Sequence, residues 1–107
     1  MNVRFDDKEL ERLFDTGYSK TYRKIARDKW LLDKFVAIVN TMKIAKDCDN
    51  LKLYPSLHYE RLKYEYSGKS SVRLSNSYVG RLIFTEEDGG ITVNLLEIDE
   101  THYGNKK

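Results

Sequence analysis

The spacing of the apolar residues changes near Pro55, and this change limits the folds open to the chain. Before Pro55 apolar residues recur every three or four positions, which is the period of a helix with one buried face. After it they recur at every second position, which is the period of a strand. Helices followed by strands predict an α+β fold, in which a small twisted antiparallel sheet carries two N-terminal helices on one face.

The N-terminal segment predicts a short strand followed by a helix. The strand covers 2–5, and the helix lies within 6–17. Asp6 or Asp7 is suited to cap the free N–H groups at the helix start, and Gly17 is suited to the left-handed residue that stops a helix.

A second, longer helix is predicted to begin near Ser19 and to end between 40 and 46. Neither glycine nor proline interrupts it, and its apolar residues keep a helical spacing. The central stripe consists of Leu31, Phe35, Ile38 and Met42. After this helix, 46–56 reads as a capped single turn or a short helix closed by Pro55.

The second half of the chain predicts antiparallel strands. They cover approximately 61–66, 71–74, 81–85 and 91–98, and polar or glycine-containing turns separate them. The element order is therefore β-α-α-β-β-β with three or four strands after the helices. At 107 residues the chain forms a single domain, 1–107.

Two arginines face each other in the predicted hairpin "SVRLSNSYVGRLIF". A symmetric turn centred near Ser77 places Arg73 directly opposite Arg81. Like charges in this position destabilise a sheet unless something neutralises them. One explanation is an anionic partner such as an RNA phosphate, whose oxygens match the arginine fork. The other is pairing with Glu65 or Glu97 and contact with tyrosine rings.

The basic residues are distributed unevenly, although the net charge is only +2. The stretch 20–29 has five bases and one acid, 52–83 has six bases and two acids, and 84–101 has six acids and no base. This asymmetry predicts a basic surface beside an acidic one. Ordinary solvated faces explain the helical stretch equally well.

Several classes of protein are excluded by composition. Two histidines 44 residues apart and a lone cysteine give no zinc-type ligand spacing, so we expect no metal or other cofactor. No apolar run is long enough to cross a bilayer, and the acidic N-terminus does not resemble a secretory signal. We therefore expect a cytoplasmic protein that makes no membrane contact. Near the C-terminus, His102 has the side chain best suited to transfer protons near neutral pH.

Four segments together resemble the HigB-like toxins of the RelE/ParE superfamily, which are the toxin halves of bacterial type II toxin–antitoxin systems. These segments are "VRFDDKELERLFDTG", "LYPSLHYERLK", "SVRLSNSYVGRLIF" and "LLEIDETHY". The resemblance implies a RelE/ParE-like fold over the whole chain. It also implies a ribosome-dependent endoribonuclease that cleaves mRNA without metal, and thereby inhibits translation.

The resemblance also assigns roles to individual residues. The implied catalytic residues are Lys63, Arg73, Arg81, Asp99 and His102. Residues expected to contact RNA are Tyr103, Lys69, Tyr78, Lys20, Arg23, Lys24 and Arg27. The implied partners are a helix-turn-helix antitoxin of the HigA type, the ribosome and mRNA, with operator DNA bound only through the antitoxin.

The chain departs from the family pattern at several positions. Glu60 occupies a place where the family often has histidine, Tyr64 replaces a usual glycine, and the segments near Arg81 and His102 are longer. Two alternatives therefore stay open. One is a catalytically inactive toxin-like module that still binds an antitoxin, and the other is a ParE-like inhibitor of gyrase.

Overall fold

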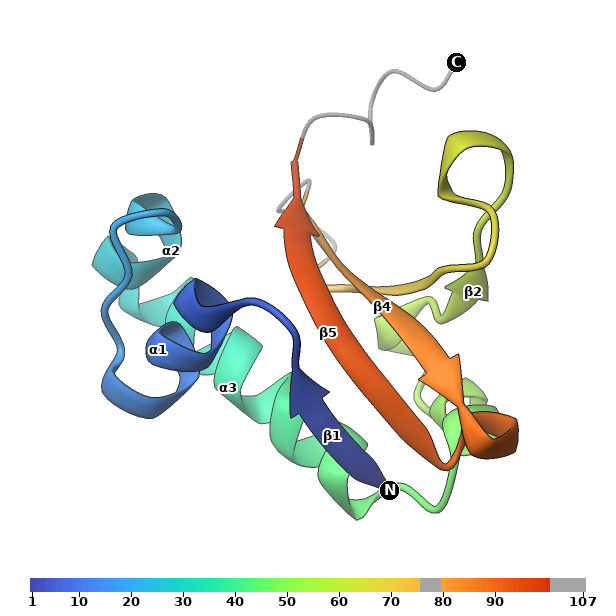
Figure 1. The fold of residues 1–107 in the computed structure, drawn as a ribbon. Coiled ribbons are helices and arrows are strands. Elements are labelled where there is room, and N and C mark those ends of the chain that lie inside the picture. Colours follow the sequence, from blue (N-terminus) through green and yellow to red (C-terminus); the bar gives the residue numbers. More distant parts are fainter. Residues whose placement is uncertain (76–79, 101–107) are drawn as a thin grey trace.

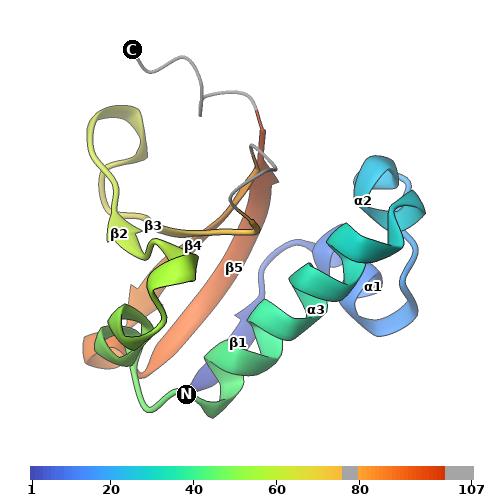
Figure 2. The same cartoon turned by 180° about the vertical axis from the view of Figure 1, so that it is seen from behind.

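The computed structural model of the chain describes residues 1–75 and 80–100. A five-stranded sheet, in the order β1-β5-β4-β3-β2, carries the α-helices on one side (Figures 1 and 2). The strands are β1 (Asn2–Phe5), β2 (Glu60–Arg61), β3 (Ser70–Arg73), β4 (Arg81–Glu87) and β5 (Thr92–Asp99). The α-helices are α1 (Lys8–Thr16), α2 (Arg23–Arg27) and α3 (Lys29–Ile44). The 3-10 turns are η1 (Cys48–Leu53), η2 (Pro55–Leu57), η3 (Tyr64–Tyr66) and η4 (Asp88–Gly90).

The sheet confirms the α+β class and adds one parallel pair. Strands β2 to β5 pair with one another in antiparallel fashion, as predicted. Strand β1 pairs with β5 in parallel, with Asn2 opposite Thr92 and Phe5 opposite Leu95. A parallel pair needs a long crossover, which the helices and the other strands provide here. The first and last strands of the chain therefore lie side by side.

Helix α1 forms as its sequence predicts. The Asp7 carboxylate accepts a hydrogen bond from the Leu10 N–H at 3.2 Å, which satisfies one of the free donors of the first turn. The helix stops at Gly17, whose φ of 78° lies in the left-handed region that glycine tolerates.

The single long helix predicted from Ser19 is wrong, because two helices occupy this stretch. Asp28 separates α2 from α3 with an extended backbone, φ −106° and ψ 99°. Its carboxylate accepts hydrogen bonds from the N–H groups of Trp30 and Leu31 at 3.1 and 3.2 Å. The apolar spacing continues across the break, so the local capping at Asp28 was not visible in the pattern. The predicted stripe on α3 is buried, as expected.

The strand predicted over 61–66 is also wrong. Strand β2 contains only Glu60 and Arg61, and the chain then enters the turn η3. Tyr64 has a positive φ of 60° and is 91% exposed, so it does not face the core. The alternation of apolar and charged residues here belongs to a turn, in which the Tyr66 N–H donates to the Lys63 carbonyl.

The hydrophobic core lies between α3 and the sheet. Phe35, Val39 and Met42 on α3 are fully buried with Leu82 and Phe84 on β4. Figure 2 shows α3 running along the sheet, with α1 and α2 gathered toward one of its ends. All α-helices of the described residues thus lie on one face of the sheet.

A polar cluster centred on Glu86 connects β4 to the edge of the sheet formed by β3 and β2. The Glu86 carboxylate accepts hydrogen bonds from Ser70 Oγ at 2.6 Å and from the Tyr59 hydroxyl, and Arg61 lies 3.4 Å away. Burial raises the pKa of Glu86, but the bonds from Ser70 and Tyr59 and the charge of Arg61 outweigh it, so the pKa lies below its usual value. Burial also raises the pKa of Tyr59 and of Cys48 to about 12.

Candidate nucleic-acid interface

Three charged residues form one row across the sheet. Arg73 on β3 is directly opposite Arg81 on β4, and Arg81 is directly opposite Asp99 on β5. Directly opposite residues project from the same face of a sheet. The next residue inward on each strand belongs to the hydrophobic core, so this row projects from the face away from α3. The register predicted for the arginine hairpin is confirmed.

Asp99 neutralises one of the two arginines. Its Oδ2 lies 3.6 Å from Arg81 Nη2, and the two side chains are only 4% and 11% exposed. A buried guanidinium requires such a counter-charge, because desolvating an isolated charge is very costly. The sequence had suggested pairing with Glu65 or Glu97 as the alternative to an anionic partner. The carboxylate that pairs with Arg81 is instead Asp99, supplied by the adjacent strand.

Tyr66 lies beside the charged row and supplies the contact between an arginine and a tyrosine ring that the sequence offered as part of the alternative to an anionic partner. Arg81 Cζ is 5.5 Å from the centre of the Tyr66 ring, and Lys69 Nζ is 5.4 Å from the same centre. Burial raises the pKa of Tyr66, and the negative charges of Glu97 and Asp99 raise it further. The hydroxyl therefore stays protonated at neutral pH. Tyr66 brings Lys69 and Arg81 together over one aromatic ring, which favours both cations electrostatically.

Lys63 does not lie on the sheet face. It was expected to project from a strand beside Arg73, but it precedes η3 as an exposed loop residue. Lys63 therefore does not extend the row formed by Arg73, Arg81 and Asp99. Of the other predicted site residues, Tyr78, His102 and Tyr103 lie outside the described residues.

The basic residues of the α2 region are all on the surface. Lys20, Arg23, Lys24 and Arg27 are exposed, and Lys24 Nζ is 3.9 Å from Glu100. Such an exposed pair contributes little stability. This cluster provides a cationic surface on the helical side of the molecule.

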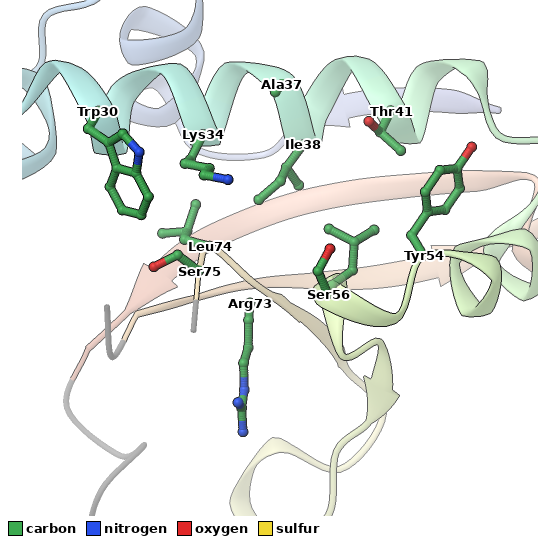
Figure 3. Close-up of a pocket in the computed structure, with 11 residues that line it drawn as sticks. Trp30, Lys34, Ala37, Ile38, Thr41, Tyr54, Ser56, Arg73, Leu74 and Ser75 are labelled. Atoms are coloured by element: carbon green, nitrogen blue, oxygen red, sulfur yellow. The ribbon is translucent and has the colours of Figure 1, made fainter. Parts of the chain in front are cut away.

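A groove separates α3 from the end of β3. Its volume is about 420 Å³, and it is lined by Trp30, Lys34, Ala37, Ile38, Thr41, Tyr54, Ser56, Leu57, Arg73, Leu74 and Ser75. Figure 3 shows Trp30, Lys34 and Ile38 pointing from α3 toward the opposite wall, whereas the Arg73 side chain points away from α3. Sequence reasoning did not single out Trp30 or Tyr54, since an exposed aromatic residue within a helical or turn pattern carries no signal of its own.

Comparisons with known proteins identify the family. A family model described as RelE-like toxin of type II toxin-antitoxin system HigB matches residues 3–100. The chain belongs to the HigB-like toxin family. A solved structure titled YoeB/ParE toxin, from Agrobacterium tumefaciens, is similar to this HigB-like toxin with a TM-score of 0.51. The two chains are 15% identical, and the match covers 92% of this chain and 95% of the other, which supports the fold alone. No curated protein matches the chain.

Membership places this HigB-like toxin in a type II toxin–antitoxin system, so an antitoxin is its expected partner. Within 1–75 and 80–100, no helix is long and apolar enough to cross a membrane. The same ranges contain no group of three or more His, Cys, Asp or Glu side chains arranged to hold a metal ion.

Proposed function

We propose that this HigB-like toxin is a ribosome-dependent endoribonuclease that cleaves mRNA without metal and so inhibits translation. The observation that supports this most directly is the row of Arg73, Arg81 and Asp99 on the face away from α3. Two arginines directly opposite each other on neighbouring strands can offer guanidinium donors to phosphate oxygens in a geometry that a single lysine cannot match. The proposal also rests on the family, whose HigB-like members the sequence resembles.

The reaction that this surface would support is transfer of phosphorus to the neighbouring 2′-oxygen of the RNA. The 2′-hydroxyl loses its proton to a base as its oxygen bonds to phosphorus, and the bond to the 5′-oxygen breaks as that oxygen gains a proton. Negative charge builds on the phosphate oxygens meanwhile, and Arg73 and Arg81 would stabilise it.

His102 is the proposed proton-transfer group. Strand β5 ends at Asp99, and His102 is only three residues further along the chain. That separation limits their Cα atoms to about 11 Å apart. Asp99 itself is occupied by its ion pair with Arg81, so we assign it to holding the guanidinium in place rather than to transferring protons. Lys63 is an exposed loop residue, so it would contact RNA outside the row formed by Arg73, Arg81 and Asp99.

The proposed partners follow from the same assignment. A helix-turn-helix antitoxin of the HigA type would silence the toxin, and only this antitoxin would bring the toxin to operator DNA. The exposed bases of the α2 region would contact ribosomal RNA by screened, sequence-independent attraction. Cytoplasmic location is expected for a protein that acts on ribosomes.

Replacing Arg73 by alanine tests the nuclease. The variant is expected to relieve growth arrest on induction, because losing one donor to the developing charge reduces the rate by about a hundredfold or more. Arg4→Ala is the matched control, since Arg4 is a 64% exposed arginine on β1 that pairs only loosely with Glu87. Full growth arrest and unchanged mRNA cleavage by Arg73→Ala would count decisively against the proposal.

One observation favours a second candidate, a catalytically silent module that only binds its antitoxin. Arg81 is already neutralised by a carboxylate of its own chain, which reduces the positive charge available to a phosphate. Expression without the antitoxin distinguishes the two. The silent module predicts normal growth and intact mRNA together with tight pairing to the antitoxin, and the nuclease predicts growth arrest with cleaved mRNA. A ParE-like gyrase inhibitor would instead induce DNA-damage signalling.

A further inference from the structure

The groove between α3 and the end of β3 combines exposed aromatic rings with positive charge. Trp30 and Tyr54, at its two ends, are 53% and 41% exposed (Figure 3). Concave sites lined by aromatic side chains with a few polar groups are the usual form of a ligand-binding pocket. Lys34 Nζ lies 5.3 Å from the centre of the Trp30 ring, so a cation sits directly beside one of these aromatic side chains.

The charge of the groove points to an anionic guest. The charge comes from Lys34, since the Arg73 side chain points away from α3, and none of the residues that line the groove is Asp or Glu (Figure 3). Thr41 and Ser56 supply hydroxyl groups on facing walls, which can hydrogen-bond the edge of a flat polar ring. Aromatic faces combined with cations are the usual way in which proteins hold single-stranded nucleic acid.

The size of the groove is compatible with a single nucleotide. Its volume of about 420 Å³ falls within the range of small-ligand sites.

We propose that this groove binds one unstacked nucleotide of single-stranded RNA, with the base against Trp30 or Tyr54 and the phosphate toward Lys34. The inference rests on the proposed function for its biological substrate, the mRNA. It adds a subsite outside the charged row. Arg73 connects the two, since it is one of the residues that line the groove and its side chain points away from α3 (Figure 3). An RNA strand held at the charged row would pass the end of β3 and place a neighbouring nucleotide in the groove.

The position of the subsite has a consequence for specificity. A nucleotide in the groove would be next to, and not at, the cleaved phosphate. Discrimination there would arise from stacking strength and from the Thr41 and Ser56 hydroxyl groups, so it would favour certain bases without requiring one. A preference of this kind would act on top of any selection made by the ribosome.

Trp30 is the only tryptophan of the chain, so intrinsic fluorescence reports on the groove directly. The experiment titrates the full chain with a 2′-O-methyl RNA hexanucleotide, which lacks the attacking hydroxyl and cannot be cleaved. Single strands are expected to quench Trp30, and the same sequence in a duplex is not. Tyr54→Ala and Lys34→Glu should each weaken binding by about fivefold to a hundredfold, as loss of one base–aromatic stack would. Tyr64→Ala is the control, since Tyr64 is 91% exposed and does not line the groove.

The outcomes separate this inference from the proposed nuclease. Arg81→Lys keeps a cation beside Asp99 but loses the guanidinium fork, so it should slow mRNA cleavage strongly and keep the Trp30 quenching, which would support the groove as a separate subsite. Quenching by single strands in a chain that arrests no growth would support the groove and refute the nuclease. Unchanged Trp30 fluorescence with RNA, equal weakening by Tyr64→Ala, or quenching only by an acidic peptide of the antitoxin would each overturn the inference.

Discussion

At the residue scale, the central finding is how Arg81 is stabilised. Two arginines directly opposite each other repel, and a buried guanidinium is costly without a counter-charge. Asp99 supplies that charge from the adjacent strand at 3.6 Å, and the Tyr66 ring lies 5.5 Å from the same guanidinium. The pair of arginines is therefore compatible with a folded chain before any RNA binds. Whatever anion binds here meets an Arg81 whose orientation is already set.

Replacing Asp99 by alanine is expected to destabilise the fold by about 3–5 kcal/mol, because it leaves a buried charge uncompensated. Urea denaturation of the two proteins measures the difference. Glu100→Ala is the matched control, since Glu100 is the adjacent acid and its exposed pair with Lys24 at 3.9 Å is worth at most about 1 kcal/mol. Equal stability of Asp99→Ala and Glu100→Ala would contradict the stabilising role of the buried pair.

At the element scale, a single side chain decides where α2 ends and α3 begins. Asp28 has an extended backbone and accepts hydrogen bonds from two N–H groups at the start of α3. The break separates the short basic helix α2 from the long buried helix α3. It thereby places Trp30 in the first turn of α3, at one end of the groove.

Asp28→Ala should lower the free energy of unfolding by about 0.5–2 kcal/mol through loss of the cap. Thermal and urea unfolding measure this change. Asp33→Ala serves as the comparison, because Asp33 is 64% exposed on the same helix and pairs with Lys29 on the surface. A loss no larger than that of Asp33→Ala would show that the cap contributes little and that the packing of α3 sets the break.

At the scale of the whole molecule, segments that are far apart in the sequence are joined at both edges of the sheet. At one edge β1 pairs in parallel with β5. At the other, Glu86 on β4 binds Tyr59, Arg61 and Ser70, which belong to the segment before β2, to β2 and to β3. This cluster connects the turn-rich region 48–69 to the sheet through polar contacts.

The Glu86 cluster predicts a stability that depends on acid pH. The pKa of Glu86 is lower in the folded protein than its ordinary value of 4.5. Its stabilising effect is therefore complete above pH 4.5 and is lost as the pH falls through the lowered folded value. Glu86→Gln should be clearly less stable than the unmodified protein at pH 7, and the difference should shrink toward pH 3.

Urea denaturation at several pH values tests this, with Glu87→Gln as the control because the Glu87 side chain is 49% exposed. A stability difference for Glu86→Gln that stays constant from pH 7 to pH 3 would rule out the ionised carboxylate as its origin.

The local features of this chain were predictable from its sequence. The capping of α1 by Asp7, its stop at Gly17, the buried stripe of α3 and the register of Arg73 opposite Arg81 each depend on residues close together in the chain. Predictions from apolar spacing were wrong where the same spacing fits two different local structures. Apolar spacing ran through the break at Asp28, and the alternation at 61–66 belonged to a turn.

The sequence by itself determined the α+β class, the hairpin and the presence of two facing arginines, because hydrophobic periodicity and turn residues act over short distances. Only the tertiary structure decided that Asp99 neutralises Arg81, that β1 pairs in parallel with β5, and that Trp30 and Tyr54 border one groove. These contacts join segments from different parts of the chain. Their geometry depends on how the helices and the sheet pack together, which no local pattern encodes.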